Sequence, residues 1–125
     1  MLISVARGVI LLTILNAGCN CIDLVQLHRS LPSPGGRHVV DEYTVSGGGA
    51  AGWSSTRVIV RRVDQDFHSA GDYVFEGLTD PPLDIKWRDN NTVTIAYPSN
   101  SEVTKTVKTW NDIKLEYVTS GQKAK

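Results

Sequence analysis

The sequence predicts an all-β protein: a single antiparallel meander sheet of five to seven strands, preceded by an N-terminal signal or anchor helix. Three observations support this prediction. Apolar and polar residues alternate along several short segments, turn-forming residues separate these segments about every ten positions, and no long helical period occurs after Pro34. The alternative is that the same sheet curls into a sandwich or an open barrel.

Seven segments after the first turn are typical of strands. In the clearest of them, Leu83, Ile85 and Trp87 share one face while Asp84 and Lys86 share the other. Two later segments alternate in the same way, with one face formed by Val93, Ile95 and Tyr97 and by Ile113, Leu115 and Tyr117. This period of two marks a sheet with one buried face. The expected strands are Arg37–Val45, Thr56–Val63, Tyr73–Leu78, Leu83–Trp87, Thr92–Tyr97, Val103–Trp110 and Ile113–Val118.

One segment differs from the others because its apolar residues are continuous. Val58–Val60 is an unbroken β-branched run, which predicts a central strand that is covered on both faces. The turns agree with this layout. Ser33–Gly36 opens the first strand, Asp80–Pro82 breaks the chain, and Asp89–Asn91 joins two strands through residues that tolerate left-handed backbone.

The residues before the first turn predict a tether, at 19–34. Within it, Asp23–His28 has the spacing of a short helical turn, with Leu24 and Leu27 on one side, and Pro32 ends it. The β-domain is then expected at 35–120 and a polar tail at 121–125.

Length and charge limit the classes of protein to consider. The chain has 125 residues, enough for one domain, and its 13 basic residues balance 13 acidic ones. A nucleic-acid-binding surface would need a basic surplus, so we expect no nucleic acid as a partner. Three Trp and four Tyr indicate a folded chain, and two Cys are too few for a disulfide scaffold.

The first eighteen residues have the three parts of an export signal. Arg7 is the one charged side chain, Gly8–Leu15 is an apolar block, and small residues follow at Ala17 and Gly18. A transmembrane anchor is the alternative, although the apolar block is shorter than the roughly 20 residues that a spanning helix needs. We therefore expect a signal peptide at 1–18.

Ala17-Gly18-Cys19, placed after a leucine-rich block, resembles the lipobox of bacterial lipoproteins. Leu15 stands one place earlier than the leucine that is usual in that family. The resemblance implies cleavage after residue 18 and lipid attachment to Cys19, whose thiolate is the nucleophile that takes the lipid. Asn20, in place of the Asp that retains family members at the inner membrane, implies the outer membrane. The implied partner is membrane lipid, with an envelope protein as a second one.

The segment from Ser33 to Val118 also resembles a group of small bacterial proteins that are often lipoproteins. They share a Ser-Pro-x-Gly opening, a Gly-Gly-Ala segment, and a Trp followed by a polar turn and a Val-x-Ile strand. The matching residues are Ser33–Gly36, Gly48–Ala50, Ser55, Thr56, Trp87 and Val93–Ile95. This resemblance implies a β-rich domain and carries no activity.

A glycine-rich segment is the strongest candidate for a functional loop. Gly47–Gly52 matches the G-x-G-x-x-G pattern of dinucleotide-binding proteins, but that mechanism needs a helix next, and a β-branched strand follows here. We therefore expect no nucleotide cofactor. Two interpretations stay open: a mobile loop between strands, or a recognition loop in which Gly48, Gly49 and Trp53 contact a partner.

Other polar residues carry no recognisable chemistry. The histidines are His28, His38 and His68, which lack the short spacing of zinc ligands. The acidic residues of one loop are Asp64, Asp66 and Asp72, without the spacing of a calcium loop. The basic residues of one strand are Arg57, Arg61 and Arg62, which we interpret as surface residues paired with Asp or Glu.

The sequence therefore predicts a lipid-anchored envelope protein that faces the periplasm and acts by binding or as a structural component. We expect no enzymatic activity, no metal and no cofactor. A pocket that brings His38 or His68 next to an acid or a serine would favour a hydrolase instead. The main alternative is a periplasmic inhibitor or immunity-type protein that uses Trp53 and the glycine loop to block an envelope-targeting toxin or enzyme.

Overall fold

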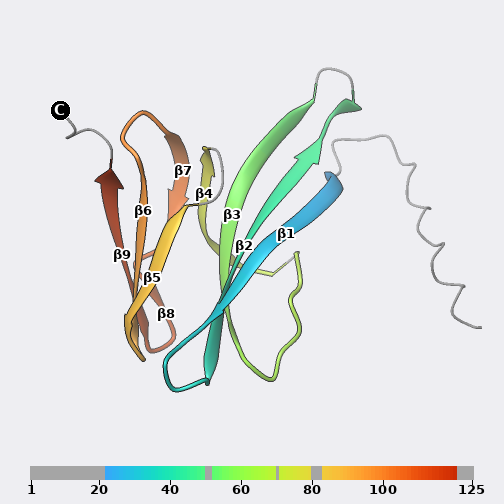
Figure 1. Cartoon of the computed structure of the whole chain (residues 1–125). Helices are drawn as coiled ribbons and strands as arrows, with labels where there is room; N and C mark the ends of the chain where they lie inside the picture. The colour runs from blue at the N-terminus through green and yellow to red at the C-terminus, as the bar shows by residue number, and fades with distance from the viewer. Residues whose placement is uncertain (1–21, 50–51, 70, 80–82, 121–125) are drawn as a thin grey trace, which may run out of the picture.

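The computed structural model describes residues 22–49, 52–69, 71–79 and 83–120, which form nine strands (Figure 1). These residues contain no α-helix, so the all-β prediction is confirmed. The strands are β1 (Ile22–Pro32), β2 (His38–Gly47), β3 (Trp53–Arg62), β4 (Tyr73–Leu78), β5 (Asp84–Asp89), β6 (Thr92–Pro98), β7 (Glu102–Thr106), β8 (Thr109–Trp110) and β9 (Ile113–Ser120).

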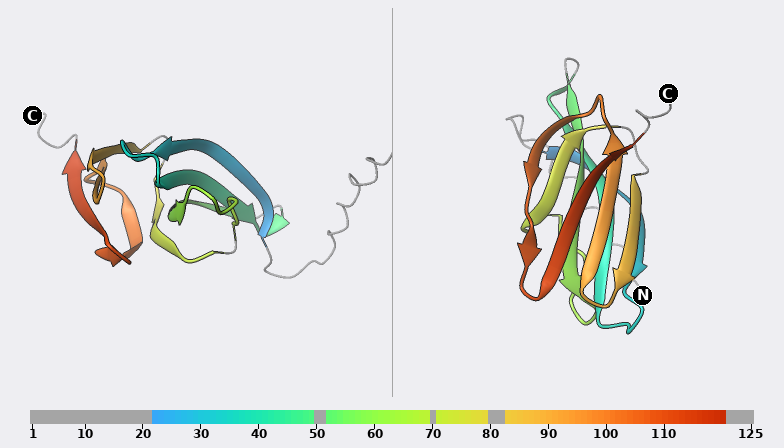
Figure 2. Two further views of the ribbon diagram at one scale, coloured as in Figure 1. Left: turned by 90° about the horizontal axis from the view of Figure 1, so that it is seen from below. Right: turned by 90° about the vertical axis from the view of Figure 1, so that its left-hand side faces the viewer.

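The strands form two sheets rather than one meander, which makes the sandwich alternative the correct one. The first sheet has the order β1-β2-β3-β4-β7 and is antiparallel throughout. The second has the order β5-β6-β9-β8 and includes a parallel pair, β6 and β9. A single sheet with one apolar face would leave that face in water, and a second layer removes it. Figure 2 shows β5, β6 and β9 crossing in front of the first sheet.

The core fills the space between the two sheets. Val58, at the centre of β3, and Ile95, at the centre of β6, are fully buried in it, and Phe75 packs against Tyr97 and Tyr117. Its buried members are Val40, Val58, Val60, Val74, Phe75, Leu83, Ile85, Val93, Ile95, Ile113 and Leu115. The alternating residues predicted to face inward are the ones that supply the second sheet's half of this core.

The continuous run Val58–Val60 is covered on both faces, as the sequence predicts. Val58 and Val60 lie in the main core, whereas Ile59 points to the opposite face of the sheet. There it joins a small cluster with Tyr43 and Val45, against which Phe67 of the β3–β4 loop packs. The loop therefore acts as a partial third layer over one region of the outer face.

The segment predicted to be a tether with a helical turn is a strand, and this part of the prediction is wrong. β1 pairs with β2 along almost its whole length, from Ile22 opposite Gly47 to Pro32 opposite Val39. Two irregularities, between Ile22 and Leu24 and between Leu27 and Arg29, shift the register. Such bulges break the period of two that identifies a strand in a sequence.

The single strand expected over Val103–Trp110 is divided into β7 and β8. At Val107 and Lys108 the chain leaves the first sheet and enters the second. The Val107 amide donates to the Val74 carbonyl at 2.8 Å, and the Tyr117 hydroxyl lies 2.7 Å from the Val107 carbonyl. This crossing closes one side of the sandwich and raises the pKa of Tyr117 to about 12, because the hydroxyl is buried there.

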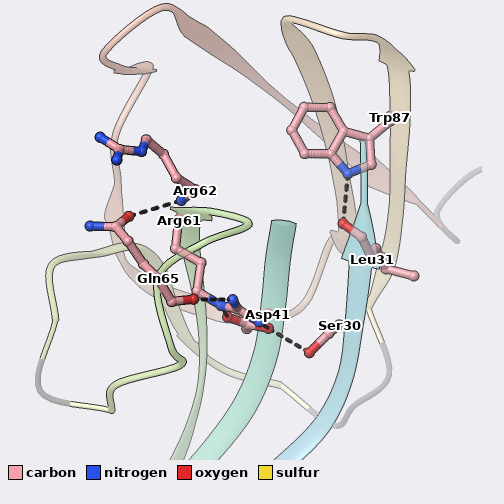
Figure 3. A network of polar contacts seen from close by, with 7 residues as sticks. All are labelled: Ser30, Leu31, Asp41, Arg61, Arg62, Gln65 and Trp87. Carbon is pink, nitrogen blue, oxygen red and sulfur yellow. Dashed lines mark hydrogen bonds and ion pairs between the residues drawn. The ribbon is translucent and has the colours of Figure 1, made fainter. Parts of the chain in front are cut away.

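The other side of the sandwich is closed by a group that we call the clamp: Arg29, Glu42 and Leu83. The fully buried Glu42 carboxylate accepts hydrogen bonds from Arg29 Nε and from the Leu83 amide, both at 2.7 Å. The Arg29 guanidinium also donates to the Leu83 carbonyl. Two residues after Arg29 along β1, the Leu31 carbonyl accepts a hydrogen bond from the Trp87 indole at 2.9 Å (Figure 3). The clamp therefore attaches β1 and β2 to the start of the second sheet.

Candidate functional site

The glycine loop predicted from the sequence is the end of the long β2–β3 hairpin. Gly47 pairs with Trp53 across this hairpin, and on its other side Gly47 pairs with Ile22 at the start of β1. Figure 1 shows the hairpin end beside the first residues of β1. We call this group, with Leu24 and Gly48, the apolar tip.

Glycines in this turn are required by their backbone and their neighbours. Gly48 and Gly49 have φ angles of 87° and 63°, a region that other residues avoid. A Cβ on Gly48 would lie 2.9 Å from Trp53 Cδ1, so the indole packs against the bare glycine. A Cβ on Gly52 would lie 2.7 Å from the Gly47 carbonyl oxygen. The glycines thus fix where the Trp53 ring lies.

Exposed apolar side chains gather around this turn. Trp53 is 40% exposed and Leu24 is 58% exposed, although both are large apolar residues. Of the eight exposed large apolar residues among those the structure describes, five lie on β1 or at the start of β3. They are Ile22, Leu24, Val25, Leu27 and Trp53. An exposed apolar patch on a small protein is typical of an interaction surface.

The hairpin part of the apolar tip is uncharged, whereas in β1 Asp23 stands between Ile22 and Leu24. No Asp, Glu, Lys or Arg occurs anywhere in residues 43–56, which span the end of β2, the turn and the start of β3. On the inner side of the sheet, Ser54 borders a hollow of about 570 Å³. Its other lining residues are Leu78, Thr79, Pro98, Asn100 and Ser101. The hairpin and the hollow beside it therefore present apolar and neutral polar groups.

Farther down the outer face, the arginines of β3 form the ion pairs that the sequence predicts. Arg57 contacts Glu76 at 2.9 Å, Arg61 contacts the buried Asp41 at 2.6 Å, and Arg62 contacts Asp64. Asp41 also accepts a hydrogen bond from Ser30 at 2.5 Å, as Figure 3 shows. The predicted pairing is confirmed, but of the three arginines only Arg62 is an exposed surface residue, since Arg57 and Arg61 are largely buried.

Glu76 is the most strongly bonded of these acids. Burial alone would raise its pKa, but hydrogen bonds from Arg57, Ser55 and Thr104 outweigh burial and lower it. Arg57 also stacks on the Tyr73 ring at 4.1 Å from its centre. Each of the three arginines of β3 is matched by a carboxylate, so these pairs stabilise the sheet.

The histidines lie in three separate places. His28 bonds to Thr44 at 2.6 Å, and His38 packs edge-on against Trp110. His68 shares a pocket of about 210 Å³ with Asp66 and Asp72, yet within the described residues no hydrogen bond joins it to either acid. A nucleophile and base in hydrogen-bond contact are the mark of a catalytic pair. In residues 22–49, 52–69, 71–79 and 83–120, no cluster of His, Cys, Asp and Glu has the arrangement of a metal site.

The sequence-predicted residues divide into two groups. Gly48, Gly49 and Trp53 lie together at the apolar tip, whereas Cys19 lies outside the described residues. Sequence reasoning missed Ile22 and Leu24, which β1 brings beside Trp53. The sequence holds one hint, the apolar residues Ile22, Leu24, Val25 and Leu27 that follow Cys21, but it does not show that they lie beside Trp53.

Comparisons with known proteins add no family to this description. No protein-family model, curated protein or solved structure matches the chain. In the part of the chain that the structure describes, no helix has the length and apolar character needed to span a membrane.

Proposed function

We propose that this chain is a bacterial envelope lipoprotein, anchored by lipid on Cys19 and facing the periplasm, with the outer membrane favoured over the inner one. The observation that carries the proposal is the order of residues at the N-terminus: Arg7, the apolar block Gly8–Leu15, and Ala17-Gly18-Cys19. The β-sandwich then acts as a binding module or as a structural part of the envelope.

The position of the fold in the sequence supports this proposal. All nine described strands begin after Cys19, the first of them at Ile22. Cleavage after residue 18 would therefore remove no strand and no member of the main core. An exported domain has to remain folded once its leader is cut, and this arrangement meets that requirement.

Metabolic labelling of the full chain with an alkyne fatty acid, in a bacterial host, tests the proposal. We expect the label on the wild-type chain and its loss in Cys19→Ser, because serine lacks the thiolate that accepts the lipid. Intact mass should show a chain that begins at Cys19 and carries two or three acyl chains, the number that gives stable anchoring.

The matched control is Cys21→Ser, which removes the neighbouring thiol and leaves the lipobox-like residues unchanged. It should keep the label and the mass of the wild-type chain. Label that persists in Cys19→Ser, or a mature chain that still begins at Met1, would show that the proposal is wrong.

A further inference from the structure

The distance between the expected lipid and the fold is short. Ile22 follows Cys19 by three residue steps, and a chain extends by at most about 3.6 Å per residue, so the two lie within about 11 Å of each other. A lipidated cysteine sits at the surface of the bilayer. If Cys19 carries lipid, the start of β1 cannot lie far from the headgroups.

The register of the sheet places a second apolar element at the same level. Ile22, Gly47 and Trp53 form one row across β1, β2 and β3, so Trp53 stands two strand spacings, about 10 Å, from Ile22. Leu24 pairs with Ser46 and thus points to the opposite face of the sheet from Ile22. The end of the sheet therefore carries large apolar side chains on both faces, Ile22 and Trp53 on one and Leu24 on the other, with Asp23 between the two apolar residues of β1 in the sequence.

The chemistry of this end suits a bilayer interface. Trp is enriched at the headgroup level, where an apolar ring with one polar N–H is stable. Charged groups resist entry, and residues 43–56 carry none. The Gly52 amide donates to the Gly49 carbonyl at 2.9 Å, and the indole packs against Gly48. A preorganised aromatic side chain loses little freedom when it makes contact.

We propose that the apolar tip contacts the membrane, with Ile22, Leu24 and Trp53 in the headgroup region of the leaflet that holds the lipid. This inference rests on the proposed function, because the lipid on Cys19 brings the tip to the bilayer. It adds an orientation: the long axis of the sandwich points away from the membrane, and the opposite end, with the β1–β2, β5–β6 and β8–β9 turns, faces the periplasm.

The test uses the full, lipidated chain in vesicles of phosphatidylethanolamine and phosphatidylglycerol, with lipids brominated near the headgroup as quenchers of tryptophan emission. Wild-type emission should fall with brominated lipid, and Trp53→Phe should abolish that loss. Trp110→Phe is the matched control and should still show the loss of emission with brominated lipid, since Trp110 lies beside His38 at the end of the sandwich opposite the apolar tip. Quenching that persists in Trp53→Phe would overturn the inference.

The intact mass of each sample separates the two proposals. A chain without lipid overturns both. A lipidated chain whose tryptophan emission is not quenched overturns the membrane contact and leaves the lipoprotein proposal in place.

A photo-crosslinking residue at position 53 in whole cells separates a lipid from a protein partner. Adducts with phospholipid support the inference. Adducts with an envelope protein or a toxin, without lipid adducts, overturn it and favour the inhibitor or immunity-type alternative.

Discussion

Two regions of the first sheet, the clamp in the middle of β1 and β2 and the apolar tip at one end of the same strands, are built on opposite principles. At the clamp, the buried Glu42 carboxylate accepts hydrogen bonds from the Arg29 guanidinium of β1 and from the Leu83 amide just before β5, at 2.7 Å each. At the apolar tip the inward-facing residues become small and polar, as at Thr44, Ser46 and Ser54, and the core ends. The clamp stabilises the fold, and the tip is left free to contact something else.

The difference between the clamp and the apolar tip shows where this protein tolerates exposed apolar surface. Leucine and tryptophan are exposed where no second sheet covers them, while Asp41 and Glu42 are fully buried where partners surround them. A buried charge persists only when it is paired and bonded, and an exposed apolar patch persists where a partner or surface covers it. The main core is entirely apolar, so partners decide burial only for the charged residues of this protein.

The largest expected effect comes from breaking the clamp. Glu42→Ala leaves the Leu83 amide and the Arg29 guanidinium without their acceptor, so we expect the free energy of unfolding to fall by about 3–5 kcal/mol. Denaturant unfolding of the purified chain measures it. Glu116→Ala, which removes the exposed pair with Arg88, should cost less than about 1 kcal/mol. Equal losses in the two variants would contradict the role of the clamp.

A medium effect is expected from substitution of the turn glycines. Gly48→Ala forces a left-handed alanine and meets the Trp53 ring, so it should cost about 2 kcal/mol and change the Trp53 emission. Gly49→Ala has a positive φ but nothing within 4 Å, so it should cost about 1 kcal/mol and leave the emission unchanged. Identical spectra for the two variants would show that Gly48 does not seat the ring.

A smaller effect is expected from pH, through Glu76. Its pKa in the folded chain lies below the usual 4.5, so the stability it contributes is complete above that value and is lost as the pH falls through the folded pKa. The difference in unfolding free energy between wild type and Glu76→Gln should therefore be constant above pH 4.5 and shrink below it. A difference that grew on acidification would contradict the hydrogen bonds from Arg57, Ser55 and Thr104.

The smallest effect on stability is expected at the apolar tip itself. Leu24→Ser replaces a side chain that is 58% exposed, so the free energy of unfolding should change by less than about 0.5 kcal/mol. Val60→Ala, on the same sheet but inside the core, should cost about 2 kcal/mol or more. A large loss of stability in Leu24→Ser would mean that the tip belongs to the core after all.

Much of the fold is predictable because alternation is a local property. The strand at Tyr73–Leu78 has the predicted bounds, and the inward faces at Ile85, Ile95 and Leu115 are those that the pattern indicates. β1 escapes the prediction because its two register shifts disturb the alternation. The parallel pairing of β6 with β9 is not predictable from alternation. It arises because β7 pairs with β4 in the first sheet, so that one edge of β6 is available to β9.

The candidate site divides in the same way. Gly48, Gly49 and Trp53 are recognisable in the sequence because a glycine-rich turn with an exposed aromatic is a local signal. Ile22 and Leu24 are not, since their proximity to Trp53 depends on pairing with β2 across more than twenty residues of chain.

The sequence by itself determined the all-β class, the positions of the turns and the inward faces of the three strands that alternate cleanly, because side-chain period and turn chemistry act over a few residues. Only the tertiary structure decided that there are two layers, that β1 is an edge strand, and that Glu42 reaches Leu83. Those outcomes depend on which strands find partners, and the choice of partner is made by contacts between residues that are far apart in the chain.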